Sequence, residues 1–162
     1  MQTASLIATG VVLFVGLYGL MSLLIREAGK AGARVIGLPE GFIPAHPVWY
    51  HHHAASGAIA NKLAIELFKN SIEIPGPETA ALCEAARDAN AYVVVGVCEK
   101  MPNTLGTMFN TQLYIGPDGA LIRKHQKIMP TGGERLVHMG GFGDTFGVFP
   151  SEFGPMSGLI CG

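Results

Sequence analysis

Three residues with complementary chemistry, Glu40, Lys127 and Cys161, lie far apart in the chain, and each closely follows a short apolar run that is typical of a strand. In open α/β sheets, functional groups gather beyond the carboxyl ends of the strands. We therefore expect a carboxylate, an ammonium group and a thiol to converge at one edge of a sheet.

A carboxylate, an ammonium group and a thiol suit covalent hydrolysis of an electrophilic carbon that bears nitrogen. A thiol attacks best as the thiolate, which a neighbouring lysine favours. A carboxylate can accept the thiol proton and later activate a water molecule. The ammonium group can stabilise negative charge that develops on the substrate.

Each of these residues also has an ordinary structural interpretation. Glu40 follows a proline at a strand end, where a carboxylate is usually a surface group, and Lys127 belongs to a basic stretch, KHQK, that is typical of a solvated loop. An isolated cysteine such as Cys161 is most often an inert core residue. Cys83 and Cys98 are interpreted in that way.

The elements that must position these residues alternate between helix and strand. Apolar spacing at helical intervals predicts helices over 20–31, with Gly32 as C-cap, over 55–70, and from Pro77 to about Ala89. Strand-like runs cover 34–38, 92–98, 108–115, 120–124 and 155–160, and Gly116–Gly119 predicts a hairpin turn. The alternation indicates a single α/β domain over residues 1–162.

Composition narrows the class of protein. The 162 residues are 49% apolar and carry a formal charge of −1, so they can form a core but lack the basic excess of a nucleic-acid-binding domain. Three cysteines without close pairing argue against a disulfide framework and against a cysteine-rich zinc site, which favours a reducing, cytoplasmic compartment. His51–His53 are adjacent and alternate in direction, so they lack the spacing of metal ligands.

The N-terminal segment allows two interpretations. Residues 5–25 contain no charged side chain, and their length is sufficient for a membrane-spanning helix. Arg26, Lys30 and Arg34 follow, so such a span would leave the rest of the chain in the cytoplasm. The alternative is a buried first strand followed by the start of a core helix, interrupted by Gly10, Gly16 and Gly19.

Four segments resemble the nitrilase branch of the carbon–nitrogen hydrolase superfamily, in that family's order and approximate spacing. They are GARVIGLPEGFIPAHPVW (32–49), VVVGVCEK (93–100), FNTQLYIGPDGALIRKHQKIMPTGGERLV (109–137) and GLICG (158–162). The Lys-x-x-Pro-Thr-x-x-Glu-Arg pattern is specific, whereas the Pro-Glu element alone is weak. The resemblance covers roughly residues 20–162.

The resemblance implies roles for individual residues. Glu40 matches the general base, Lys127 the catalytic lysine and Cys161 the nucleophile. Glu134 matches a further acidic residue that positions the lysine or assists the base. The implied reaction is hydrolysis of a nitrile to a carboxylic acid and ammonia through a covalent thioimidate, with no metal or organic cofactor. Trp49 follows Glu40 closely and is a candidate for lining the substrate pocket, with ordinary packing as its alternative.

The same resemblance implies a partial αββα sandwich with the C-terminal half missing, because family members continue well beyond the nucleophile. Two alternatives follow: an amidase or carbamoylase, which uses the same triad, and an inactive truncated chain that acts at most through a partner. The resemblance implies a small-molecule nitrile or amide as substrate and a homo-oligomer, a dimer or a spiral. Location is expected to be cytoplasmic, or membrane-anchored through residues 5–25 with the domain in the cytoplasm.

Overall fold

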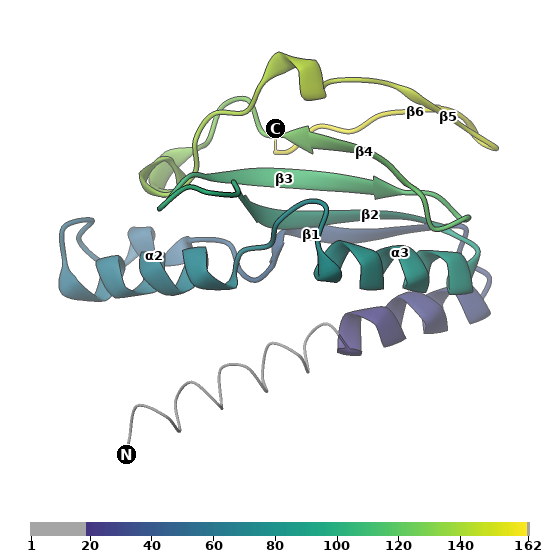
Figure 1. Ribbon diagram of the computed structural model, residues 1–162, viewed down its shortest axis with the longest axis horizontal. Helices are drawn as coiled ribbons and strands as arrows, with labels where there is room; N and C mark the ends of the chain where they lie inside the picture. The colour runs from purple at the N-terminus through teal and green to yellow at the C-terminus, as the bar shows by residue number, and fades with distance from the viewer. Residues whose placement is uncertain (1–18, 162) are drawn as a thin grey trace.

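A computed structural model describes residues 19–161 of the chain (Figure 1). Its elements, in chain order, are a helix over residues 19–30, β1 (Val35–Ile43), the 3-10 helix η1 (Val48–His51), α2 (Ala58–Asn70), α3 (Pro77–Ala89), β2 (Tyr92–Lys100), β3 (Met108–Ile115), β4 (Leu121–Gln126), the 3-10 helices η2 (Gly132–Leu136) and η3 (Gly143–Thr145), β5 (Phe149–Ser151) and β6 (Gly154–Met156).

The main sheet has four strands in the order β1-β2-β3-β4. β1 and β2 are parallel, and the connection between them contains α2 and α3, whereas β2, β3 and β4 run antiparallel as a meander. β5 and β6 form a separate antiparallel pair. Figure 1 shows the helix over 19–30 and α3 on one side of the sheet, with β5 and β6 on the other.

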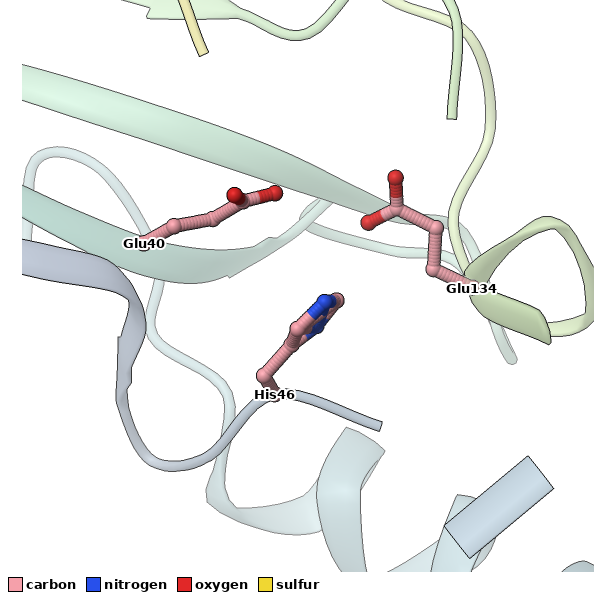
Figure 2. A group of neighbouring side chains, drawn as sticks. All are labelled: Glu40, His46 and Glu134. Carbon is pink, nitrogen blue, oxygen red and sulfur yellow. The ribbon is translucent and has the colours of Figure 1, made fainter. Parts of the chain in front are cut away.

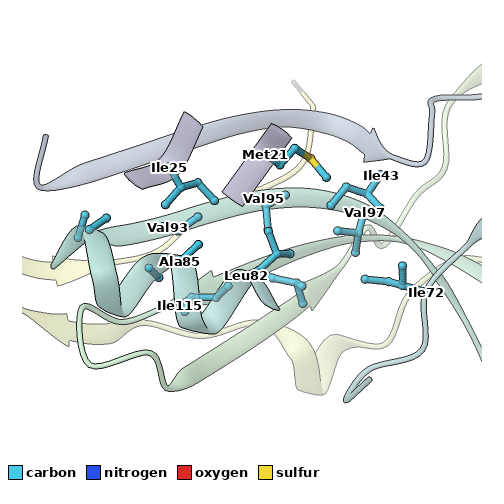
Figure 3. Close-up of a cluster of buried hydrophobic side chains, with 14 residues drawn as sticks. Met21, Ile25, Ile43, Ile72, Leu82, Ala85, Val93, Val95, Val97 and Ile115 are labelled. Atoms are coloured by element: carbon cyan, nitrogen blue, oxygen red, sulfur yellow. The ribbon is translucent and has the colours of Figure 1, made fainter. Parts of the chain in front are cut away.

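The main hydrophobic core lies between the sheet and these helices (Figure 3). Alternate residues of β2, namely Val93, Val95 and Val97, are fully buried there, as the period-two geometry of a strand requires. Met21 and Ile25 pack on them from the helix over 19–30. We call this side of the sheet the helix face and the opposite side the site face.

Most of the predicted elements are confirmed. The helix over 19–30 is followed by Gly32 with a φ of 90°, and Pro77 opens α3. β3 has the predicted bounds of 108–115. The mixed α/β class is therefore confirmed.

Two strand predictions were wrong in detail. β1 does not end at Leu38 but continues to Ile43, so Glu40 lies within the strand rather than after it. The run over 155–160 is not a strand, because β6 covers only Gly154–Met156 and the chain then reaches Cys161 without regular structure. Short apolar runs that contain glycine carry too little periodicity to fix where a strand ends.

The predicted alternatives for residues 5–25 are only partly testable, because residues 5–18 lie outside the described residues. Residues 19–25 belong to the helix over 19–30, and Met21 and Ile25 are buried in the core. Among residues 19–161, none of the helices combines the length and apolar character that crossing a bilayer requires.

Candidate active site

Three of the four predicted catalytic residues form one cluster. The Lys127 ammonium donates hydrogen bonds to Glu40 Oε1 at 3.0 Å and to Glu134 Oε1 at 2.5 Å. The Lys127 and Glu134 side chains are almost completely buried, whereas the Glu40 side chain is 30% exposed. A lysine thus joins two carboxylates from segments about 90 residues apart, with one carboxylate open to solvent.

An irregularity in β1 directs Glu40 to this cluster. Leu38 pairs with Val95, and Ile43 pairs with Val97, so four residues of β1 lie opposite the single residue Gly96. Strict alternation from Leu38 would point Glu40 toward the helix face. Like a β-bulge, the extra residues change the direction of the side chains, and Glu40 reaches Asn110 and Lys127 on the site face.

Gly96 permits the close approach of β1 at this irregularity. A Cβ atom at position 96 would lie 2.4 Å from the Pro39 carbonyl oxygen and 2.6 Å from Glu40 Cα. Both are backbone atoms that cannot turn aside. Glu40 can therefore occupy its position only because residue 96 of β2 is a glycine, which has no side chain.

Lys127 is positioned by the end of the β3–β4 pairing. Its backbone N–H donates to the Asn110 carbonyl at 2.8 Å, which extends the ladder by one residue beyond β4. Asn110, His125 and Lys127 share the site face, because the pairing aligns His125 with Gln112.

Glu134 is fixed by the start of η2. Its Oε1 accepts the Thr131 backbone N–H at 2.5 Å, which closes a capping box around the first turn. The sequence Pro130-Thr131-x-x-Glu134 therefore forms a rigid corner that turns the carboxylate inward toward Lys127.

The cluster retains its charges despite burial. Burial alone would lower the pKa of Lys127, but hydrogen bonds and charge from Glu134 and Glu40 outweigh it and raise the pKa. Burial would raise the pKa of Glu134, but hydrogen bonds from Lys127, the Thr131 N–H and Asn110 outweigh it and lower the pKa. The ammonium and the Glu134 carboxylate therefore stay ionised near neutral pH.

Asn110 is a member of the cluster that the sequence analysis missed. Its Nδ2 donates to Glu40 Oε1 at 2.7 Å and to Glu134 Oε2 at 2.9 Å, and the residue is only 1% exposed. The amide therefore bridges the two carboxylates, and on Glu40 it donates to the same oxygen as the ammonium. An asparagine inside the strand-like run MFNTQLYI was the available signal, because asparagine is disfavoured in strand interiors.

A second polar network lies behind the cluster, on the helix face. Glu99 Oε2 accepts hydrogen bonds from Thr111 Oγ1 at 2.8 Å and from Gln126 Nε2 at 3.0 Å, and Glu99 also pairs with Lys124. Thr111 directly follows Asn110 in the sequence, and Gln126 directly precedes Lys127. Glu99 therefore ties β2, β3 and β4 together at the level of the site.

Two histidines that the sequence analysis did not single out adjoin the carboxylates. His46 presents a ring nitrogen to Glu40 and Glu134, and the three donor atoms all lie within 4.8 Å of one another (Figure 2). His138 Nδ1 lies 3.5 Å from Glu134 Oε2, which is long for a hydrogen bond. Burial lowers the pKa of His138 to about 4, against the opposing effect of Glu134. Of the described residues, Glu40, His46 and Glu134 are the set that could hold a metal ion.

Cys161 lies outside the contacts of this cluster. Its side chain is exposed and unpaired with another cysteine, and its φ of 68° is unusual for a residue other than glycine. Within residues 19–161, no hydrogen bond joins Cys161 to Glu40 or Lys127. The nearby chain is anchored by the Tyr114 hydroxyl, which donates to the Gly158 carbonyl at 2.9 Å.

Trp49 belongs to η1 and packs against Leu67 of α2 and Cys98 of β2. The indole is half-buried and lines a cavity of about 200 Å³ together with Pro44, Ala45 and Leu67. Ala45 immediately precedes His46, so this cavity adjoins the site along the chain. The cysteines interpreted as inert are half-buried at Cys83 and buried at Cys98, where burial raises the pKa of Cys98 to about 12.

Comparison with known proteins is consistent with this geometry. The carbon–nitrogen hydrolase family profile matches residues 13–162. A nitrilase from Bacillus sp. (strain OxB-1) is 39% identical over 138 residues, and an aliphatic nitrilase from Sinorhizobium fredii is 39% identical over 141 residues; each match covers 85% of this chain. The chain spans 39% and 44% of the length of these two relatives.

Solved structures show the same fold at lower identity. An amidase from Nesterenkonia sp. superposes with a TM-score of 0.60 at 19% identity, over 91% of this chain and 50% of that one. A CN-hydrolase superfamily protein from Xanthomonas campestris gives 0.63 at 18% identity, over 91% and 47%. A third structure, also of the Nesterenkonia amidase, carries the acetamide moiety of fluoroacetamide on its active site cysteine; it gives 0.60 at 18% identity, over 88% and 48%.

Proposed function

The chain belongs to the carbon–nitrogen hydrolase family, and from this premise we propose that it carries the nitrile-hydrolysing residues of a nitrilase. The observation that carries the proposal is the buried ammonium of Lys127 held between Glu40 and Glu134, with Asn110 bridging the two carboxylates. Eight curated nitrilases are 33–39% identical to this chain, whereas the matching amidase structures are 17–19% identical, which favours a nitrile over an amide.

The reaction proceeds in two stages through a covalent intermediate. Glu40 accepts the thiol proton of Cys161 as sulfur attacks the nitrile carbon, and the nitrogen gains a proton to give a thioimidate. Glu40 then activates water, which adds to the same carbon, and ammonia leaves as the C–N bond breaks. A second water breaks the thioester, frees the carboxylic acid and restores the thiol.

The other residues of the cluster orient Glu40 and Lys127 and stabilise charge on the substrate. Lys127 contributes positive charge where negative charge develops on the substrate. Glu134 holds the ammonium in place and keeps it protonated, and Asn110 fixes the Glu40 carboxylate. The greater exposure of the Glu40 side chain, 30% against 6% for Lys127, suits a base that must meet thiol and water.

The proposal requires Cys161 to approach the cluster. Tyr114 and Asn110 project from the same face of β3, four residues or about 13 Å apart. Tyr114 anchors Gly158, and three residues of extended chain reach about 10 Å. This anchor on the site face supports an approach of the Cys161 thiol toward Glu40 through a rearrangement of residues 159–161.

Several further features belong to the same proposal. The cavity that Trp49 lines would receive the part of the substrate remote from the nitrile carbon. Three cysteines without a disulfide suit a cytoplasmic protein, and the family resemblance implies a homo-oligomer. The family's amidase members make amide or carbamoyl hydrolysis the second candidate, because the same residues serve both reactions.

The test is ammonia release from aliphatic and aromatic nitriles by the 162-residue chain. We expect release that Cys161→Ala and Lys127→Met each abolish and that Cys83→Ala, a matched cysteine control outside the cluster, leaves intact. Release from amides but not from nitriles would favour the second candidate. Absence of release from either class, or release that survives Cys161→Ala, would contradict the assignment.

A further inference from the structure

The carboxylates of the cluster face an imidazole that the proposed reaction does not use. One donor atom from each of Glu40, His46 and Glu134 lies within 4.8 Å of the other two, and the three side chains point toward one another (Figure 2). The Nδ1 atom of His46 is buried and has no hydrogen-bond partner among residues 19–161. Two carboxylate oxygens and an imidazole nitrogen form a donor set that Zn²⁺ accepts.

His138 is a second, independent indication of a missing ligand. It is only 4% exposed, and within the part of the chain that the structure describes neither of its ring nitrogens has a hydrogen-bond partner. Its Nδ1 lies 3.5 Å from Glu134 Oε2, on the side of that carboxylate away from Lys127. Buried polar groups are nearly always hydrogen-bonded. A small movement that shortens the distance between His138 Nδ1 and Glu134 Oε2 would give this imidazole a hydrogen-bond partner. A hydrogen bond from His138 would orient Glu134 once that carboxylate bound a cation.

The Lys127 ammonium occupies the position of a cation in this arrangement. It contacts one oxygen of each carboxylate, and Asn110 is the only other side chain among the described residues that hydrogen-bonds to both. The second Glu40 oxygen, Oε2, has no hydrogen bond among the described residues. A single ammonium does not balance two carboxylates, whereas one divalent cation in its place does.

We propose that Glu40, His46 and Glu134 form a binding site for Zn²⁺ that competes with Lys127 for the two carboxylates. The donors contract from separations of up to 4.8 Å to the spacing of a tetrahedral ion with bonds of about 2 Å, and a water molecule completes the coordination. His138 donates to Glu134 and holds it on the ion. Lys127 withdraws from Glu40, because a divalent cation and an ammonium group repel each other at this distance.

Zinc binding would have a functional consequence that rests on the proposed function. The ion removes Glu40 from its role as base and separates Lys127 from it. Zn²⁺ would therefore inhibit hydrolysis without reaction at Cys161. Binding itself is independent of turnover and can be measured on a chain that hydrolyses nothing.

The experiment measures Zn²⁺ binding by titration calorimetry in a background that removes competing donors. The exposed residues His51, His52 and His53 become Asn, and Cys161 becomes Ser. Lys127→Met is compared with this background because it removes the ammonium and keeps the apolar stem. We expect one Zn²⁺ per chain, bound about tenfold or more tightly by Lys127→Met than by the background, and a loss of about tenfold or more when His46→Asn is added.

Thermal unfolding with Zn²⁺ or EDTA provides the second measurement, because a ligand that binds the folded state raises the unfolding midpoint. It also covers a Lys127→Met variant that is unfolded without metal, since Zn²⁺ would then restore the transition. Equal affinity of the background and Lys127→Met would overturn the competition. Binding that persists after His46→Asn, or absence of binding and of a midpoint shift in every variant, would overturn the site.

Discussion

Gly96 offers a direct test of how the fold positions Glu40. A Cβ atom at this position would meet three backbone atoms of β1 at 2.4 to 2.8 Å, namely the Pro39 carbonyl oxygen, Glu40 Cα and the Gly41 nitrogen. Gly96→Ala must therefore displace β1 by roughly 1 Å to restore ordinary contact distances of about 3.5 Å. Gly37 is a matched control, because it lies in β1, the strand that Gly96 contacts, and a Cβ atom there would meet nothing within 4 Å.

We expect Gly96→Ala to lower the free energy of unfolding by about 1–3 kcal/mol, the usual cost of overpacking a filled site. For a chain of this size, that corresponds to a fall in the unfolding midpoint of about 2–4 °C per kcal/mol. Gly37→Ala should be neutral or stabilising by up to about 1 kcal/mol, because alanine restricts the unfolded chain. If turnover is observed, Gly96→Ala should also reduce it by about 10²-fold, since a 1 Å displacement of Glu40 spoils its approach.

Chemical denaturation followed by circular dichroism measures both glycine variants under the same conditions. The expected result is a clear separation between them, with only Gly96→Ala destabilised. Equal stability of the two variants would refute the claim that β1 is held against the bare backbone of β2. It would also refute the dependence of the Glu40 position on that contact.

Three further perturbations test the polar groups around the site. Burial lowers the pKa of His138 to about 4, so between about pH 6.5 and 4 the unfolded chain binds a proton that the folded chain does not. The free energy of unfolding should therefore fall by about 3 kcal/mol as the pH drops from 6.5 to 4. In denaturant titrations His138→Leu should lack this pH-dependent loss. Glu134→Gln should lower the pKa of Lys127, because it removes the charge that opposes burial, and this would appear in a titration of the lysine by NMR; an unchanged lysine pKa would contradict the pairing. Glu99→Gln should destabilise the fold by about 1–3 kcal/mol, because the buried network loses the negative charge and one of its two acceptor oxygens. Glu66→Gln, from an exposed pair within α2, should change stability by less than about 0.5 kcal/mol in the same denaturation assay.

Local sequence patterns located the elements and the outer limits of the site. Some features depend only on neighbouring residues, so a short stretch of chain determines their structure. They are the apolar β-branched run Tyr92–Cys98, the helix start at Pro77 and the helix end at Gly32. The Lys-x-x-Pro-Thr-x-x-Glu spacing placed Lys127 and Glu134 together, and a capping box confirms that this segment organises itself locally.

The meeting of Glu40 with Lys127 was decided by tertiary structure. Alternation along β1 would have directed Glu40 into the helix face, and only the register between β1 and β2, with Gly96 opposite four residues, turned it to the site face. Asn110 and His46 joined the cluster for the same reason. Their side chains are polar residues without local partners, and which carboxylate each one meets depends on strand pairing and packing across the whole sheet, which spacing along the chain does not encode.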